Sequence, residues 1–114
     1  MVVRQFLFGT GEMTLEIPAG IIDEGEESRD AAARELLEET GHSTDNWEYL
    51  GWVSPNPAFL NNRSHHWLAR DVVQTAEPNL ESGENLTVEV LSLDEIKIEV
   101  KRGLFRQALA LSAL

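Results

Sequence analysis

The chain has 114 residues, 42% of them hydrophobic, and 20 acidic residues against 9 lysines and arginines give a formal net charge of −11. The length predicts a single domain over residues 1–114. The surplus of negative charge argues against a nucleic-acid backbone or an anionic membrane surface as partner, because both attract clustered basic residues. The absence of cysteine excludes disulfides and thiolate metal sites, and it is compatible with the cytoplasmic location that we expect.

The N-terminal third predicts two strands. Residues 2–8 (VVRQFLF) read as a strand, and GTGE at residues 9–12 reads as a turn. Apolar and polar residues then alternate over residues 13–17, which is typical of a half-buried strand that ends at Pro18. No apolar run approaches the roughly 20 residues that a membrane-spanning helix needs.

An acidic loop leads into the next predicted element, a helix over residues 29–40. This segment is rich in alanine, leucine, glutamate and arginine, which all favour helix formation. Ser28 is the expected N-cap, and Gly41 the expected helix end, because glycine adopts the left-handed conformation common after a last helical turn.

The C-terminal half predicts three strands and a helix. Residues 47–55, 64–73 and 85–93 read as strands, and residues 103–114 show helical spacing of apolar positions. The strands are separated by a Pro/Asn-rich segment at residues 55–62 and an acidic loop at residues 75–84. This order of elements predicts a layered α+β domain.

The predicted helix concentrates three carboxylates on one side. At 100° per residue, Glu35, Glu38 and Glu39 share an arc of about 100° beside a wider apolar arc. Neighbouring like charges destabilise a helix by a few tenths of a kcal/mol per pair, so a bound cation would compensate for them. Carboxylate oxygens suit Mg²⁺ or Mn²⁺, and Arg34 could orient one of the carboxylates. The alternative is an acidic face that simply contacts solvent.

The spacing of these residues matches a known signature. Gly20, Glu26, Arg34, Glu35, Leu36, Glu38, Glu39 and Gly41 fall at the fixed intervals of the box that marks the Nudix hydrolases, and the sequence resembles that family. One departure is His42, where relatives usually carry an apolar residue. Segments such as TGEMTLEIPAG and EYLGWVSPNPAF extend the resemblance over nearly the whole chain, toward the branch of ADP-ribose pyrophosphatases and nucleoside-diphosphate-sugar hydrolases.

The resemblance implies a fold, a reaction and a set of roles. The fold would be a Nudix-type α/β/α sandwich with a central mixed sheet. The reaction would be Mg²⁺-dependent hydrolysis, with Mn²⁺ as a substitute metal, of the pyrophosphate bond in a nucleoside diphosphate linked to another moiety such as ribose or a sugar. The alternative is a catalytically silent module of the same fold that senses a nucleotide. A homodimer is an assembly that the resemblance allows.

Residue by residue, the resemblance places the metal on the backbone carbonyl of Ala19 and on Glu35, Glu38 and Glu39. Glu38 and Glu39 would also act in catalysis, as would Arg34, which orients a carboxylate. Glu26 would hold the loop against the helix. Glu84 aligns with an acidic loop residue that activates water in some relatives, although Glu81 lies nearby in the same loop.

Other residues are candidates for contacting the substrate. Arg63 could bind a phosphate as a charged fork, with Asn62 and Pro57 in the same segment. The alternative for these three is an ordinary loop. Glu16 could meet the sugar of the ligand or pair with an arginine. Four aromatic residues could also stack on a base, although core packing is their expected role; they are Trp47, Trp52, Phe59 and Trp67.

Overall fold

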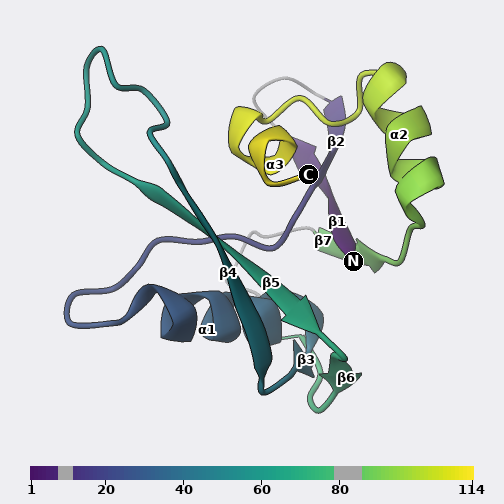
Figure 1. Cartoon of the computed structure of the whole chain (residues 1–114). Coiled ribbons are helices and arrows are strands. Elements are labelled where there is room, and N and C mark those ends of the chain that lie inside the picture. Colours follow the sequence, from purple (N-terminus) through teal and green to yellow (C-terminus); the bar gives the residue numbers. More distant parts are fainter. Residues whose placement is uncertain (8–11, 79–85) are drawn as a thin grey trace.

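The computed structural model describes residues 1–7, 12–78 and 86–114 (Figure 1). The elements in chain order are β1 (Val2–Leu7), β2 (Glu12–Glu16), α1 (Ser28–Thr40), β3 (His42–Ser43), β4 (Asn46–Val53), β5 (Ser64–Arg70), β6 (Val73–Gln74), β7 (Leu86–Glu89), α2 (Leu93–Lys101) and α3 (Ala108–Ala113). This combination of helices and strands confirms the predicted α+β class. The predicted turn at residues 9–12 lies mostly outside the described residues.

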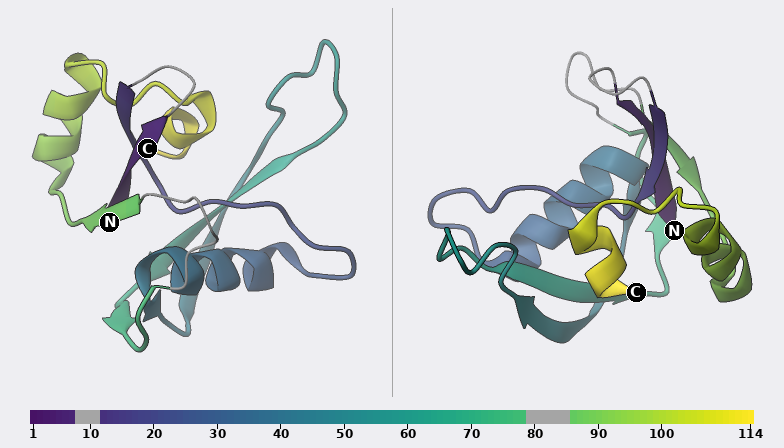
Figure 2. Two further views of the ribbon diagram at one scale, coloured as in Figure 1. Left: turned by 180° about the vertical axis from the view of Figure 1, so that it is seen from behind. Right: turned by 90° about the horizontal axis from the view of Figure 1, so that it is seen from above.

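The strands of the described residues pair in three antiparallel groups. One sheet has the order β2–β1–β7, in which Val3 pairs with Glu16 on one side and with Val88 on the other. The short strands β3 and β6 form a second pair, and β4 and β5 form a two-stranded ribbon. Figures 1 and 2 show α1 beside the β4–β5 ribbon, whereas the β1–β2 pair lies between α2 and α3.

The hydrophobic core lies where the three-stranded sheet meets the C-terminal segment. Val2, Leu15 and Phe105 are buried together, with Leu91, Ile96 and Leu104 packed partly against them. The Leu104 carbonyl accepts hydrogen bonds from the Leu15 amide (3.0 Å) and from the Thr14 hydroxyl (3.1 Å). These bonds fix the segment between α2 and α3 to β2, the strand that leads directly into the acidic loop.

Four sequence predictions about elements are wrong. The strand predicted over residues 64–73 ends at Arg70, because Asp71 adopts φ 55° and separates β5 from β6. Ser28 is not the N-cap but the first residue of α1, and Glu27 is the N-cap. The predicted strand over residues 85–93 stops at Glu89, because the capping box of Ser92 and Glu95 starts α2. The tail helix is confined to Ala108–Ala113, since Leu104 and Phe105 leave the helical spacing to reach the core.

None of the helices formed by the described residues has the length and apolar character that crossing a membrane requires. The longest of them, α1, has 13 residues.

Candidate functional site

The carboxylates of α1 are held in place by a firmly anchored helix end. Gly41 has φ 70°, and its amide donates a hydrogen bond to the Leu37 carbonyl at 2.8 Å, which confirms the predicted helix stop. The Gly41 carbonyl in turn accepts bonds from the amides of Thr75 and Ala76. The last turn of α1, which carries Glu38 and Glu39, is therefore tied to the segment that follows β6.

Arg34 is the centre of the charge network on α1. Its Nε and Nη2 donate to the two oxygens of Glu26 at 3.0 and 3.1 Å, and its Nη1 donates to Glu35 at 2.7 Å. Nη1 also donates to Glu38 at 3.5 Å, and the Ile21 carbonyl accepts from Nη2 at 2.9 Å. Arg34 therefore pairs with the carboxylates of Glu26, Glu35 and Glu38. The positive charge of Arg34 also offsets the repulsion between the neighbouring glutamates of α1.

The network changes the protonation of its members in the expected direction. The hydrogen bonds from Arg34, together with the bond from the Asp23 amide, hold the pKa of Glu26 below its usual value. The bonds to Glu26 and Glu35 raise the pKa of Arg34 further above its ordinary value. Arg34 is thus permanently charged, and Glu26 joins the acidic loop to α1 as an ionised group.

The loop after β2 lies directly against two of the carboxylates. The Ala19 amide donates to Glu39 Oε2 at 3.2 Å. A Cβ atom at Gly20 would overlap the carboxylate of Glu35, so only glycine allows the backbone this close to that side chain. The structure therefore brings the Ala19–Gly20 backbone against Glu35 and Glu39, and it is the amide of Ala19 that bonds to Glu39. The metal-binding role of the Ala19 carbonyl stays a prediction.

These groups are of the chemical type that binds a hard divalent cation. Carboxylate oxygens and a backbone carbonyl are the ligands that Mg²⁺ and Mn²⁺ prefer, and the Glu35 carboxylate lies directly against the Gly20 backbone. Over residues 1–7, 12–78 and 86–114, however, no three acidic or histidine side chains gather closely enough to hold a metal ion. Glu35 and Glu38 both approach Arg34 instead.

Glu16 lies three residues before Ala19 in the chain. It is partly buried at the end of β2, and this burial raises the pKa of its carboxyl group above the usual value. No hydrogen bond or ion pair to the Glu16 side chain is found among the described residues, so the predicted arginine partner is not observed.

The other predicted substrate contacts lie elsewhere. Pro57, Asn62 and Arg63 are exposed in the segment that joins β4 to β5, and this segment projects away from α1 (Figure 1). The Arg63 guanidinium lies over the Trp52 ring, 4.2 Å from its centroid. The structure therefore does not bring these three residues against the α1 carboxylates. Glu84 and Glu81 lie in residues 79–85, outside the described residues.

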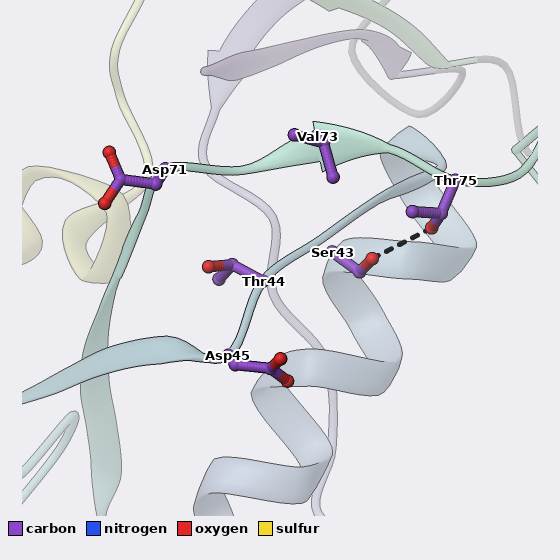
Figure 3. A pocket seen from close by; sticks show the side chains of 6 residues that line it. All are labelled: Ser43, Thr44, Asp45, Asp71, Val73 and Thr75. Carbon is purple, nitrogen blue, oxygen red and sulfur yellow. Dashed lines mark hydrogen bonds between the residues drawn. The ribbon is translucent and has the colours of Figure 1, made fainter.

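A depression of about 380 Å³ lies at a different place, between β3, β6 and the residues beside them. Figure 3 shows its lining, in which the hydroxyls of Ser43 and Thr75 are 2.9 Å apart, while Asp45 and Asp71 point away from each other. The depression holds none of the predicted site residues, and its two carboxylates do not converge.

One contact beside the site is not evident from the sequence. Trp67 Nε1 on β5 donates a hydrogen bond to the hydroxyl of Ser28 at 3.0 Å, which joins the ribbon to the first turn of α1. These residues are far apart in sequence, and the assignment of Ser28 as an N-cap left no role for its hydroxyl in such a contact.

Comparison with known proteins assigns the chain to a family. The NUDIX domain family matches residues 1–111, so the chain belongs to the Nudix family. This confirms the resemblance of its glutamate-rich box and of its fold.

Three individual proteins show which members of the family the chain is similar to. The chain is 34% identical over 96 residues to the ADP-sugar pyrophosphatase of Mus musculus, covering 82% of this chain and 44% of the relative. It is 31% identical over 108 residues to the ADP-ribose pyrophosphatase of Bacillus subtilis (strain 168), covering 92% and 58%. A crystal structure of an ADP compounds hydrolase superposes with a TM-score of 0.85 at 26% identity, covering 98% of this chain and 60% of that one. The chain thus spans about half the length of these relatives.

Proposed function

We propose that this chain is a Mg²⁺-dependent hydrolase that cleaves the pyrophosphate bond of a nucleoside diphosphate linked to another moiety. The observation that carries the proposal is the position of Glu35 and Glu39 against the Ala19–Gly20 backbone, within the Nudix box of a chain that belongs to this family. The names of the relatives, which refer to ADP-ribose, ADP-sugars and ADP compounds, support this substrate class.

The proposed metal ligands are the carbonyl of Ala19 and the carboxylates of Glu35, Glu38 and Glu39. When bound, a divalent cation lowers the pKa of coordinated water and neutralises phosphate oxygens, which lets a chain with a net charge of −11 accept an anionic substrate. Arg34 positions Glu35 through its 2.7 Å hydrogen bond. A carboxylate that is not bound to the metal takes the proton of the attacking water, and Glu84 is the proposed residue.

Glu26 supports the site from the loop. Glu26 accepts two hydrogen bonds from Arg34, and these keep the guanidinium directed at Glu35. Glu16, partly buried and unpaired among the described residues, is proposed to accept a hydrogen bond from a hydroxyl of the ligand's sugar. Glu16 ends β2, and Glu26 lies in the loop between β2 and α1.

A panel assay tests the proposal. ADP-ribose, nucleotide sugars, dinucleoside polyphosphates, NADH and nucleoside triphosphates are incubated with Mg²⁺ or Mn²⁺, and the phosphorylated products are separated. We expect release of a nucleoside monophosphate from at least one sugar-linked diphosphate. Failure to turn over any member, together with no metal binding in calorimetry, would refute the proposal.

A silent nucleotide sensor of the same fold is the alternative, and Glu38→Gln separates the two. For an enzyme that uses Glu38 as a metal ligand, this variant should lose turnover by orders of magnitude. A sensor that binds nucleotide without metal would keep its affinity in the same variant.

A further inference from the structure

His42 occupies the position at which relatives usually carry an apolar residue, and its ring makes a bond that an apolar side chain cannot make. The ring Nδ1 lies 2.8 Å from the Thr40 carbonyl oxygen. Because a carbonyl oxygen only accepts hydrogen bonds, Nδ1 carries the hydrogen and donates it. The His42 amide donates a second bond, to the Thr40 hydroxyl at 3.2 Å. His42 therefore holds Thr40, the last residue of α1, through both its ring and its backbone.

Thr40 connects this hold to the rest of the helix. It is only 2% exposed, and its hydroxyl donates a hydrogen bond to the Leu36 carbonyl at 2.6 Å. A buried hydroxyl of this kind stabilises the fold only while its hydrogen bonds are made. Thr40 directly follows Glu39 in the chain, so a movement of the Thr40 backbone displaces the turn that carries Glu38 and Glu39.

The C-terminal end of α1 is a place where a hydrogen-bond donor stabilises the helix. The last carbonyls of a helix have no partner within it, and the helix dipole places a partial negative charge there. Glu38 and Glu39 add two carboxylates to the same turn, and this turn contains no basic residue. A ring nitrogen that donates to the Thr40 carbonyl offsets this concentration of negative charge, as histidine does near other helix ends.

The backbone that carries the ring is itself restrained. His42 pairs with Gln74 in the β3–β6 pair. The preceding residue, Gly41, accepts a hydrogen bond from the Ala76 amide at 3.1 Å. The His42 ring is thus attached to a restrained segment, and its bond can determine where the Thr40 carbonyl lies.

We propose that His42 is a positioning residue of the metal site: its bond to the Thr40 carbonyl fixes the last turn of α1, and with it the carboxylates of Glu38 and Glu39. The inference rests on the proposed function for the identity of the metal ligands, and it adds a residue outside that set. Replacing a residue that orients metal ligands from outside the coordination sphere typically lowers metal affinity by about 10- to 100-fold.

Metal binding to the folded protein tests this inference without depending on turnover. His42→Leu replaces the ring with an apolar side chain of the kind usual in relatives, and His42→Ala takes its place should that variant not fold. His42→Asn keeps an N–H donor at the position of Nδ1. Gln74→Leu is the matched control, because Gln74 is exposed on the strand opposite His42 and makes no bond to Thr40.

Calorimetry measures the Mg²⁺ affinity of each protein, and the melting temperature without metal shows that each variant is folded. Long-range nitrogen–proton correlations of the wild-type ring, recorded at about pH 9, where histidine side chains are neutral, identify the nitrogen that carries the hydrogen. A purely structural role of His42 would change the melting temperature but not the Mg²⁺ affinity of the folded protein.

We expect His42→Leu to weaken Mg²⁺ binding about tenfold, whereas His42→Asn and Gln74→Leu should each change it less than about threefold. Nδ1 should carry the hydrogen of the wild-type ring. Unchanged Mg²⁺ affinity in a folded variant without the donor, equal weakening in His42→Asn, or a neutral ring with its hydrogen on Nε2 would overturn the inference. A wild type that binds Mg²⁺ in the expected pattern but hydrolyses nothing would refute the proposed function alone.

Discussion

Gly20 is a position at which one added methyl group should disturb the candidate site directly. Because a Cβ there would overlap the Glu35 carboxylate, Gly20→Ala must displace either the loop or the proposed metal ligand. We expect metal affinity or activity to fall about 10- to 100-fold, as for other changes that misplace a ligand.

Gly25→Asn is the matched control for this change. Gly25 has φ 78°, and a Cβ atom added there would meet nothing within 4 Å; asparagine also tolerates the left-handed conformation. Metal titration by calorimetry and activity against Mg²⁺ concentration measure both variants. Equal behaviour of Gly20→Ala and the wild type would contradict the role given to the Ala19–Gly20 backbone.

Glu16 gives a pH-dependent prediction. Burial raises its pKa in the folded protein, so between its unfolded and folded pKa values the unfolded state binds fewer protons, and stability falls as pH rises through this window. Glu16→Gln should therefore raise the melting temperature at pH 7 and leave it unchanged well below pH 4, where both states are protonated. Denaturation scans across pH measure this, and a destabilised variant at pH 7 would mean that the ionised carboxylate has a partner.

At the level of elements, the link between the C-terminal segment and the sheet depends on Phe105. This ring is only 3% exposed in a small core, so Phe105→Ala should lower the free energy of unfolding by about 3–5 kcal/mol. Phe59, which is 84% exposed, provides the comparison, and Phe59→Ala should change stability by less than about 0.5 kcal/mol. Chemical denaturation of both variants tests the assignment, which fails if their losses are similar.

How far the sequence predicts an element depends on where its signals lie. The composition of α1 and the glycine at position 41 are local signals, and they correctly predict a helix that stops at Gly41. The sequence also contains the capping box of α2, but the alternation of Leu86, Val88 and Val90 favours a strand that continues past it. The end of the tail helix depends on Phe105 packing against Val2 and Leu15, residues about 90 to 100 positions away, and no local pattern contains that contact.

The candidate site is likewise predictable from the sequence only in part. Its carboxylates and Arg34 follow from helical periodicity and from the Nudix box, and Arg34 does pair with Glu26 and Glu35. The bond from Trp67 to Ser28, and the position of Arg63 on Trp52 rather than beside α1, depend on how the ribbon crosses the helix. That crossing is set by tertiary packing and not by the spacing of residues.

At the scale of the whole molecule, the chain exposes more surface than its mass requires. Its accessible surface is 7766 Å², against roughly 6,300 Å² for a monomeric protein of this mass. The difference, about 1,500 Å² per chain, is within the range that stable homodimers bury. We therefore expect sedimentation equilibrium to give a dimer, and a monomer at all concentrations up to the millimolar range would contradict this expectation.

The central claim is that the α1 carboxylates bind a divalent cation that the hydrolysis of a nucleoside diphosphate requires. The most direct measurement is the turnover of ADP-ribose and nucleotide sugars at increasing Mg²⁺, by the wild type and by Glu39→Gln, together with the melting temperature of each protein. We predict no turnover without metal, saturable activation of the wild type, and a rise in its melting temperature that reflects about 2.7 kcal/mol of stabilisation at a hundredfold excess of Mg²⁺ over its dissociation constant. The variant should show neither effect. Equal activity of the two proteins, or a melting temperature of the wild type that does not respond to Mg²⁺ or Mn²⁺, would contradict the claim.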